Sequence, residues 1–152
     1  MIPGFSQRRQ FRDLSEQEVL ALAISAEEDD GRIYRWYAQR LRTDYPQSAD
    51  LFEAMAAEED RHRSRLIEEH CRRFGEVIPL IRREHVAGFY NRRPVWLVEN
   101  LGLERIRAEA ARMETEARDF YLRAAQHTSD AGTRQLLDWL SAAESGHEAT
   151  WS

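Results

Sequence analysis

The chain has 152 residues, which is enough for one domain with a single substantial core. Its 22 basic residues are all arginines and are outnumbered by 27 acidic residues, so the formal net charge is -5. This acidic balance argues against a nucleic-acid partner, which would require a basic face. No stretch approaches the ~18 consecutive apolar residues of a transmembrane helix. The single Cys71 excludes an internal disulfide, and it excludes a metal centre built from two Cys-x-x-Cys pairs.

Residues 1–14 form an N-terminal arm in which Phe5 and Phe11 lie among arginines. We expect this arm to be frayed, as chain termini commonly are; contact with an anionic surface is the alternative. The arm lacks the apolar core of a secretory signal, so the sequence points to the cytoplasm.

Residues 15–74 predict a first pair of helices. Ser15 and Glu18 have the spacing of a capping box, which satisfies two backbone N–H groups at a helix start. The first helix should run to about Arg42. A second should follow the turn at 45–48, cover roughly 48–74 and end at Gly75. Apolar residues at helical spacing mark the inner faces: Val19, Leu20, Ala23, Ile24, Leu51, Phe52, Met55 and Leu66.

Residues 76–102 are too apolar for a free linker and are cut by Pro79, Gly88, Pro94 and Gly102. They fit the long crossover between the second and third helices of a bundle in which these helices run parallel. Some of the apolar surface could instead serve a contact between subunits of a homodimer. The residues concerned are Val77, Ile78, Leu80, Ile81, Phe89, Tyr90, Trp96 and Leu97.

A second helix pair is predicted at about 103–126 and from Ala131 onwards, with a turn at 128–130. Only five residues follow His147, and no Gly or Pro among them ends the fourth helix. We therefore expect residues 15–152 to be one domain of a longer protein.

The two helix pairs repeat one another. Four residues of the first helix recur 87 positions later in the third: Ala23, Glu27, Tyr34 and Ala38 match Ala110, Glu114, Tyr121 and Ala125. Six residues of the second recur 85 positions later in the fourth: Leu51, Phe52, Met55, Ala57, Glu59 and His62 match Leu136, Leu137, Leu140, Ala142, Glu144 and His147. The halves are therefore two copies of one helix pair.

The repeat contains two Glu-x-x-His motifs, whose spacing places a carboxylate and an imidazole on the same face of a helix. One further glutamate from each half completes six candidate metal ligands: Glu27, Glu59, His62, Glu114, Glu144 and His147. Four carboxylates in a core would repel one another unless cations balance them. Two divalent ions would restore neutrality, and this donor set suits iron or manganese; zinc could substitute.

This pattern resembles the ferritin-like superfamily, and within it the rubrerythrin branch. The resemblance implies an all-α four-helix bundle that holds two iron ions and reacts with oxygen or peroxide. It also implies that Glu59 and Glu144 bridge the ions, with Glu27 and Glu114 as terminal ligands. Tyr34 would hydrogen-bond to Glu114, and Tyr121 to Glu27, orienting these ligands. The alternative is that both tyrosines are ordinary core aromatics.

Asp30 lies three residues after Glu27, on the same helix face, and its counterpart in the repeat is Ala117. Rubrerythrins carry an extra carboxylate near their metals at the position that Ala117 occupies here. Asp30 could fill that role from the other half, or it could be a solvated acid in the run of residues 27–30.

The missing cysteine pairs make the chain similar to the N-terminal domain of membrane-bound ferritin A, in which a rubrerythrin-like bundle precedes a membrane iron transporter. The resemblance implies a cytoplasmic domain that oxidises Fe(II) in iron detoxification, storage or export. Two alternatives stay open: a peroxide reductase with a separate electron donor, and an iron-sensing or interaction module without catalysis.

Overall fold

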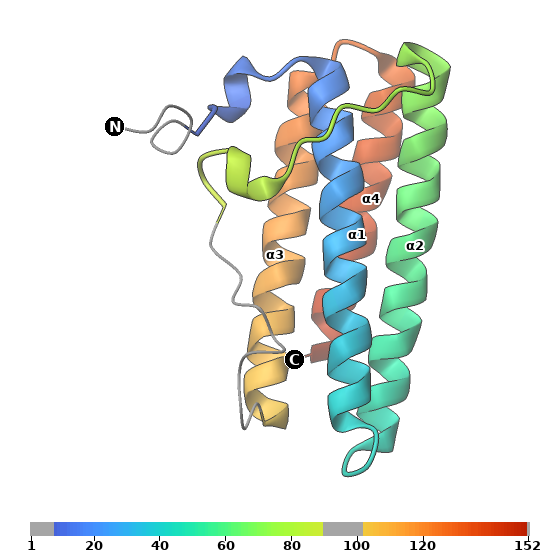
Figure 1. The fold of residues 1–152 in the computed structure, drawn as a ribbon, viewed down its shortest axis with the longest axis vertical. Coiled ribbons are helices and arrows are strands. Elements are labelled where there is room, and N and C mark those ends of the chain that lie inside the picture. The colour runs from blue at the N-terminus through green and yellow to red at the C-terminus, as the bar shows by residue number, and fades with distance from the viewer. Residues whose placement is uncertain (1–7, 90–101, 152) are drawn as a thin grey trace. The chain divides into compact units, whose positions relative to one another are not determined.

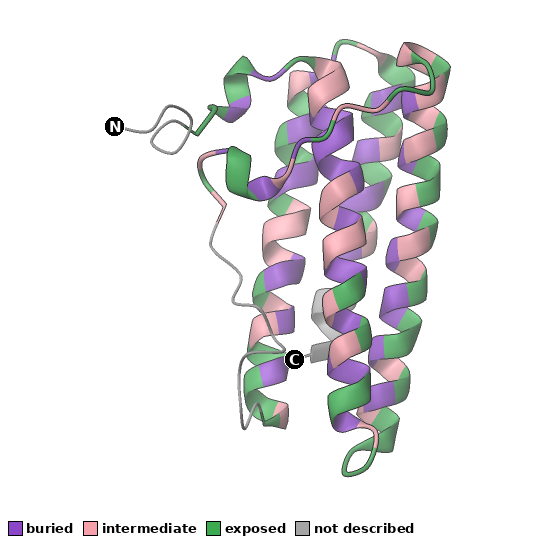
Figure 2. Cartoon of the chain, in the orientation of Figure 1, coloured by how far each residue is buried: buried purple, intermediate pink, exposed green. Residues whose placement is uncertain are grey.

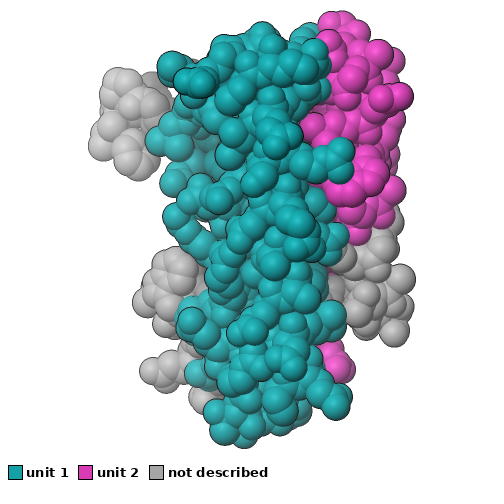
Figure 3. Space-filling model, turned by 90° about the vertical axis from the view of Figure 1, so that its right-hand side faces the viewer, with its two compact units in different colours: residues 1–95 teal, residues 96–152 magenta. Residues whose placement is uncertain are grey.

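The computed structural model describes residues 8–89 and 102–151; for residues 145–151 it describes the helix alone. Within these ranges the regular structure is helical: two short 3-10 helices, η1 (Phe11–Asp13) and η2 (Arg83–His85), and four α-helices. The α-helices are α1 (Glu16–Leu41), α2 (Pro46–Phe74), α3 (Leu103–His127) and α4 (Ala131–Trp151) (Figure 1). The chain divides into two compact units, residues 1–95 and 96–152, coloured separately in Figure 3.

The first unit is the helical hairpin of α1 and α2. As predicted, Ser15 caps α1: its hydroxyl accepts from the Glu18 N–H at 3.1 Å, and the Glu18 carboxylate accepts from the Ser15 N–H at 3.0 Å. Helix α2 begins at Pro46, two residues before the expected start, because proline suits the first turn of a helix. It ends at Gly75, whose φ of 90° few other residues adopt readily.

Aromatic packing joins the two helices. The rings of Tyr34 and Phe52 stack at 5.9 Å, and Tyr37 meets Phe52 edge-on at 5.4 Å. All three side chains are buried, and buried positions recur along both helices (Figure 2). Burying an aromatic ring of this kind contributes about 1.5–3 kcal/mol, so this cluster fixes the register of the hairpin.

The other end of the hairpin is held by His70, which is fully buried. Its Nδ1 lies 2.9 Å from the Gly75 carbonyl oxygen and therefore donates to it, while its Nε2 lies 3.4 Å from the Gln17 amide nitrogen. His70 is thus a packing residue.

Residues 8–14 are not frayed, which corrects the sequence expectation for this part of the arm. Arg9 pairs with residues after α2: its N–H donates to the His85 carbonyl at 3.0 Å, and its carbonyl accepts from the Ala87 N–H at 2.9 Å. Phe11 and Leu14 are buried. Local spacing could not indicate this because the pairing joins segments about 75 residues apart in the chain (Arg9 and Val86 form the bridge).

The crossover is described as far as Phe89. Ile81 and Val86 are buried, whereas Val77 and Leu80 are exposed. The predictions for Tyr90, Trp96 and Leu97 lie outside the described residues.

The second unit contains the hairpin of α3 and α4. Asp130 caps α4 by accepting from the Thr133 N–H at 2.9 Å, and α4 begins at Ala131 as predicted. The Ser141 hydroxyl of α4 donates to the Arg118 carbonyl of α3 at 3.3 Å. The helix bounds of both hairpins thus follow the repeat.

Candidate metal centre

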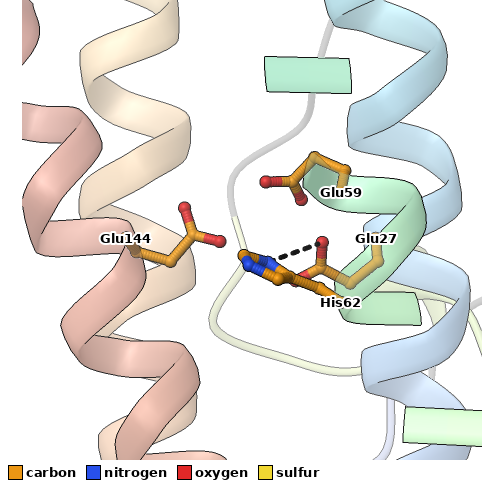
Figure 4. Close-up of side chains that lie close together, drawn as sticks. All are labelled: Glu27, Glu59, His62 and Glu144. Carbon is orange, nitrogen blue, oxygen red and sulfur yellow. Dashed lines mark ion pairs between the residues drawn. The ribbon is translucent and has the colours of Figure 1, made fainter. Parts of the chain in front are cut away.

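The first unit brings three of the predicted ligands together. Glu27 comes from α1, and Glu59 and His62 come from one face of α2, a turn apart. The three side chains are only 1–2% exposed. Figure 4 shows them converging; one ligand atom from each lies within 4.8 Å of the others.

One pair in this cluster joins the two helices. Nδ1 of His62 lies 3.7 Å from an Oε atom of Glu27, drawn as the dashed line in Figure 4. Metal–oxygen and metal–nitrogen bonds of about 2.0–2.2 Å would let one ion bind both atoms at such a separation. The arrangement of buried oxygen donors with one imidazole therefore fits a divalent cation, and the donor types favour iron or manganese.

Glu58 is a neighbour of this cluster that the ligand pattern did not single out. One of its Oε atoms lies 3.5 Å from Nε2 of His62, whereas Glu27 is near the other ring nitrogen, Nδ1. Its side chain is 30% exposed. The available signal was its position four residues before His62, which is a neighbouring position on a helix.

Asp30 is not solvated. It is 4% exposed, and its Oδ1 lies 2.9 Å from a guanidinium nitrogen of Arg83, which is itself buried. Next to this pair, Asp29 faces Arg82 at 3.3 Å, and burial of the Asp29 carboxyl raises its pKa. Arg82 and Arg83 of the crossover thus form ion pairs with Asp29 and Asp30, which follow Glu27 closely in α1. Whether Asp30 also contacts metal stays a prediction.

The remaining predicted ligands belong to the second unit. Glu114 on α3 and Glu144 on α4 are each 1% exposed, so both carboxylates are buried where the repeat predicts. Figure 4 also draws Glu144. His147 lies in α4, but its side chain is outside the described residues.

Tyr34 and Tyr121 are both buried. The ring of Tyr34 packs on Phe52, and that of Tyr121 packs on Phe120 at 5.3 Å. Their predicted hydrogen bonds to Glu114 and Glu27 stay predictions.

Within the described ranges, no helix combines the length and the apolarity that crossing a membrane requires.

The helices, their lengths and the buried carboxylate–histidine cluster define the class: the chain has the ferritin-like four-helix bundle fold predicted from its repeat. A solved structure of a hypothetical protein from Pyrococcus furiosus has the same fold, with a TM-score of 0.74 and 22% identity over 93% of this chain and 88% of that one. The chain belongs to the rubrerythrin family, whose family model matches residues 18–152. No curated protein sequence matches it.

Proposed function

We propose that this domain binds two iron ions per chain and oxidises Fe(II) with oxygen or peroxide. The observation that carries the proposal is the buried cluster of Glu27, Glu59 and His62 in a chain of the rubrerythrin family. The repeat supplies a second set of the same residue types, two of which are buried carboxylates. Two sets of three ligands suit two ions.

In this proposal each residue has a role set by its position in the repeat. Glu27 and Glu114 would be terminal ligands, His62 and His147 would each add one nitrogen to one ion, and Glu59 and Glu144 would contribute to both ions. Four carboxylates balance the four positive charges of two divalent ions, which offsets the cost of burying either set alone. Bound Fe(II) supplies one electron per ion, and two electrons with two protons reduce oxygen to hydrogen peroxide, or reduce peroxide to two water molecules.

The finer proposal is that the domain is cytoplasmic, forms a homodimer and works with a membrane iron transporter in the same protein. The resemblance to membrane-bound ferritin A motivates the transporter. The dimer is favoured by Val77 and Leu80 on the crossover, which are 85% and 74% exposed, because exposed apolar surface of this kind often marks a subunit contact. Light scattering of the domain and the coding sequence after Ser152 test the two parts separately.

The central test is an anaerobic Fe(II) titration followed by addition of oxygen or of peroxide. We expect two Fe(II) per chain and repeated oxidation of added Fe(II). Faster reaction with peroxide than with oxygen would favour the peroxide reductase, and binding without turnover would favour an iron-sensing module. The Glu68→Ala variant, which changes an exposed glutamate of the same helix, is the matched control.

A further inference from the structure

The imidazole of His62 has a carboxylate within 4 Å of each of its two ring nitrogens. Glu27 faces Nδ1 at 3.7 Å, and Glu58 faces Nε2 at 3.5 Å. The ring itself is 1% exposed, whereas the Glu58 side chain is 30% exposed. Glu58 therefore links a buried candidate ligand to the surface of α2.

In a neutral imidazole the two ring nitrogens have different roles. A neutral imidazole has one N–H donor and one lone pair, and only the lone pair can bind a metal. A proton on Nε2 would face the Glu58 carboxylate across 3.5 Å, and the lone pair on Nδ1 would then face Glu27 across 3.7 Å. Ligand histidines commonly donate their other N–H to a carboxylate, which fixes the tautomer and makes the ring a better ligand.

We propose that Glu58 is a positioning residue that holds the proton of His62 on Nε2 and so makes Nδ1 the metal-binding atom. This inference rests on the proposed function, since it assigns a role at the same site. It adds a residue outside the six repeated ligands and states which nitrogen of His62 binds.

The sequence provides this acid in only one of the two repeats. The offset of 85 that carries Glu59 to Glu144 carries Glu58 to Ala143, which has no carboxylate. The histidine of the second half therefore has no acid at the corresponding position. It follows that the two metal positions differ, and that the ion bound by His62 is held more tightly than the ion bound by His147.

The test uses the whole 152-residue chain and compares Glu58→Ala, Glu58→Gln and the control Glu68→Ala. Anaerobic titration with Co(II) alone gives the number and affinity of bound ions, and its absorption spectrum reports the ligand field. Nitrogen NMR of the metal-free protein, followed to the pH at which the ring is neutral, reports which nitrogen of His62 carries the proton.

In the wild type we expect two unequal Co(II) affinities and the His62 proton on Nε2. Glu58→Ala should weaken the tighter ion by about 10- to 100-fold and leave the other unchanged. It should also alter the cobalt spectrum and shift the His62 tautomer. Glu58→Gln keeps an oxygen acceptor and should restore most of the affinity, while Glu68→Ala should match the wild type.

Two results would overturn the inference: equal wild-type affinities, or a Glu58→Ala variant with wild-type binding and an unchanged tautomer. A wild type that binds no metal would instead contradict the proposed function. The tautomer would then decide the role of Glu58 alone, with a proton on Nδ1 of the neutral ring counting against it.

Discussion

A guanidinium nitrogen of Arg83 lies 2.9 Å from Oδ1 of Asp30, and both side chains are buried. The pair fastens the crossover to α1 one turn beyond Glu27. Replacing both residues of a buried ion pair by apolar residues destabilises a protein less than removing one of them. The single removal leaves a buried charge without its partner.

Arg83→Ala should therefore cost about 3–5 kcal/mol of unfolding free energy. The double variant Asp30→Leu with Arg83→Met should recover most of this loss, since neither charge is left behind. Urea unfolding of both variants measures the difference. A cost below about 1 kcal/mol for Arg83→Ala would mean that water screens the pair as it does at a surface.

Metal should stabilise the folded domain. Glu27, Glu59 and His62 are preorganised only when α1 and α2 are packed, so an ion binds the folded state far better than the unfolded chain. At a free concentration of 100 times the dissociation constant, one ion adds about 2.7 kcal/mol. Thermal unfolding with Mn(II) or anaerobic Fe(II) measures this gain; an unchanged melting temperature at saturation would contradict a preformed site.

The Glu18 carboxylate should make the first unit less stable at acid pH. Hydrogen bonds from Arg9, at 2.8 Å to one nitrogen, and from the Ser15 N–H hold the pKa of Glu18 at about 2, below the ordinary 4.5. A lowered folded-state pKa stabilises the protein fully above the ordinary value, and this contribution is lost as the pH falls toward 2.

The matching variant is Glu18→Gln, which should cost at most about 1 kcal/mol at neutral pH because the pair is partly exposed and screened by salt. The difference in stability between wild type and variant should shrink between pH 4.5 and about 2. Urea unfolding at several pH values tests this, and a difference that does not change with pH would contradict the assigned cause.

The sequence predicted what depends on local spacing. The cap at Ser15, the end of α2 at Gly75 and the convergence of Glu59 and His62 all follow from residues within a few positions of one another. The repeat then extended these predictions to the second hairpin. Convergence of Glu27 with α2 required only that two adjacent amphipathic helices pack face to face.

Contacts between distant segments escaped prediction. The pairing of Arg9 with the segment around Val86 and the ion pair of Asp30 with Arg83 join residues that no periodicity relates. Asp30 illustrates the consequence: spacing alone left a solvated acid and an additional ligand open. The burial of Asp30 against Arg83 removes the solvated alternative.

The bridging role predicted for Glu59 separates it from His62, although both lie on the same face of α2. A carboxylate that binds both ions cannot be removed without weakening both, so Glu59→Ala should lose most of the Fe(II) bound per chain. His62→Ala removes a ligand of one ion and should weaken the binding of that ion alone. We expect an effect of about 10- to 100-fold, the range known for losing a residue that hydrogen-bonds to a metal ligand.

Anaerobic Fe(II) titration of Glu59→Ala, His62→Ala and the control Glu68→Ala distinguishes these effects. Circular dichroism must first show that each variant keeps its helices, since a lost fold would also lose both ions. A folded Glu59→Ala variant that still binds two Fe(II) with wild-type affinity would show that Glu59 bridges nothing. Loss of only one ion would make it a terminal ligand like Glu27, and the assignment of bridging residues from the repeat would then be wrong.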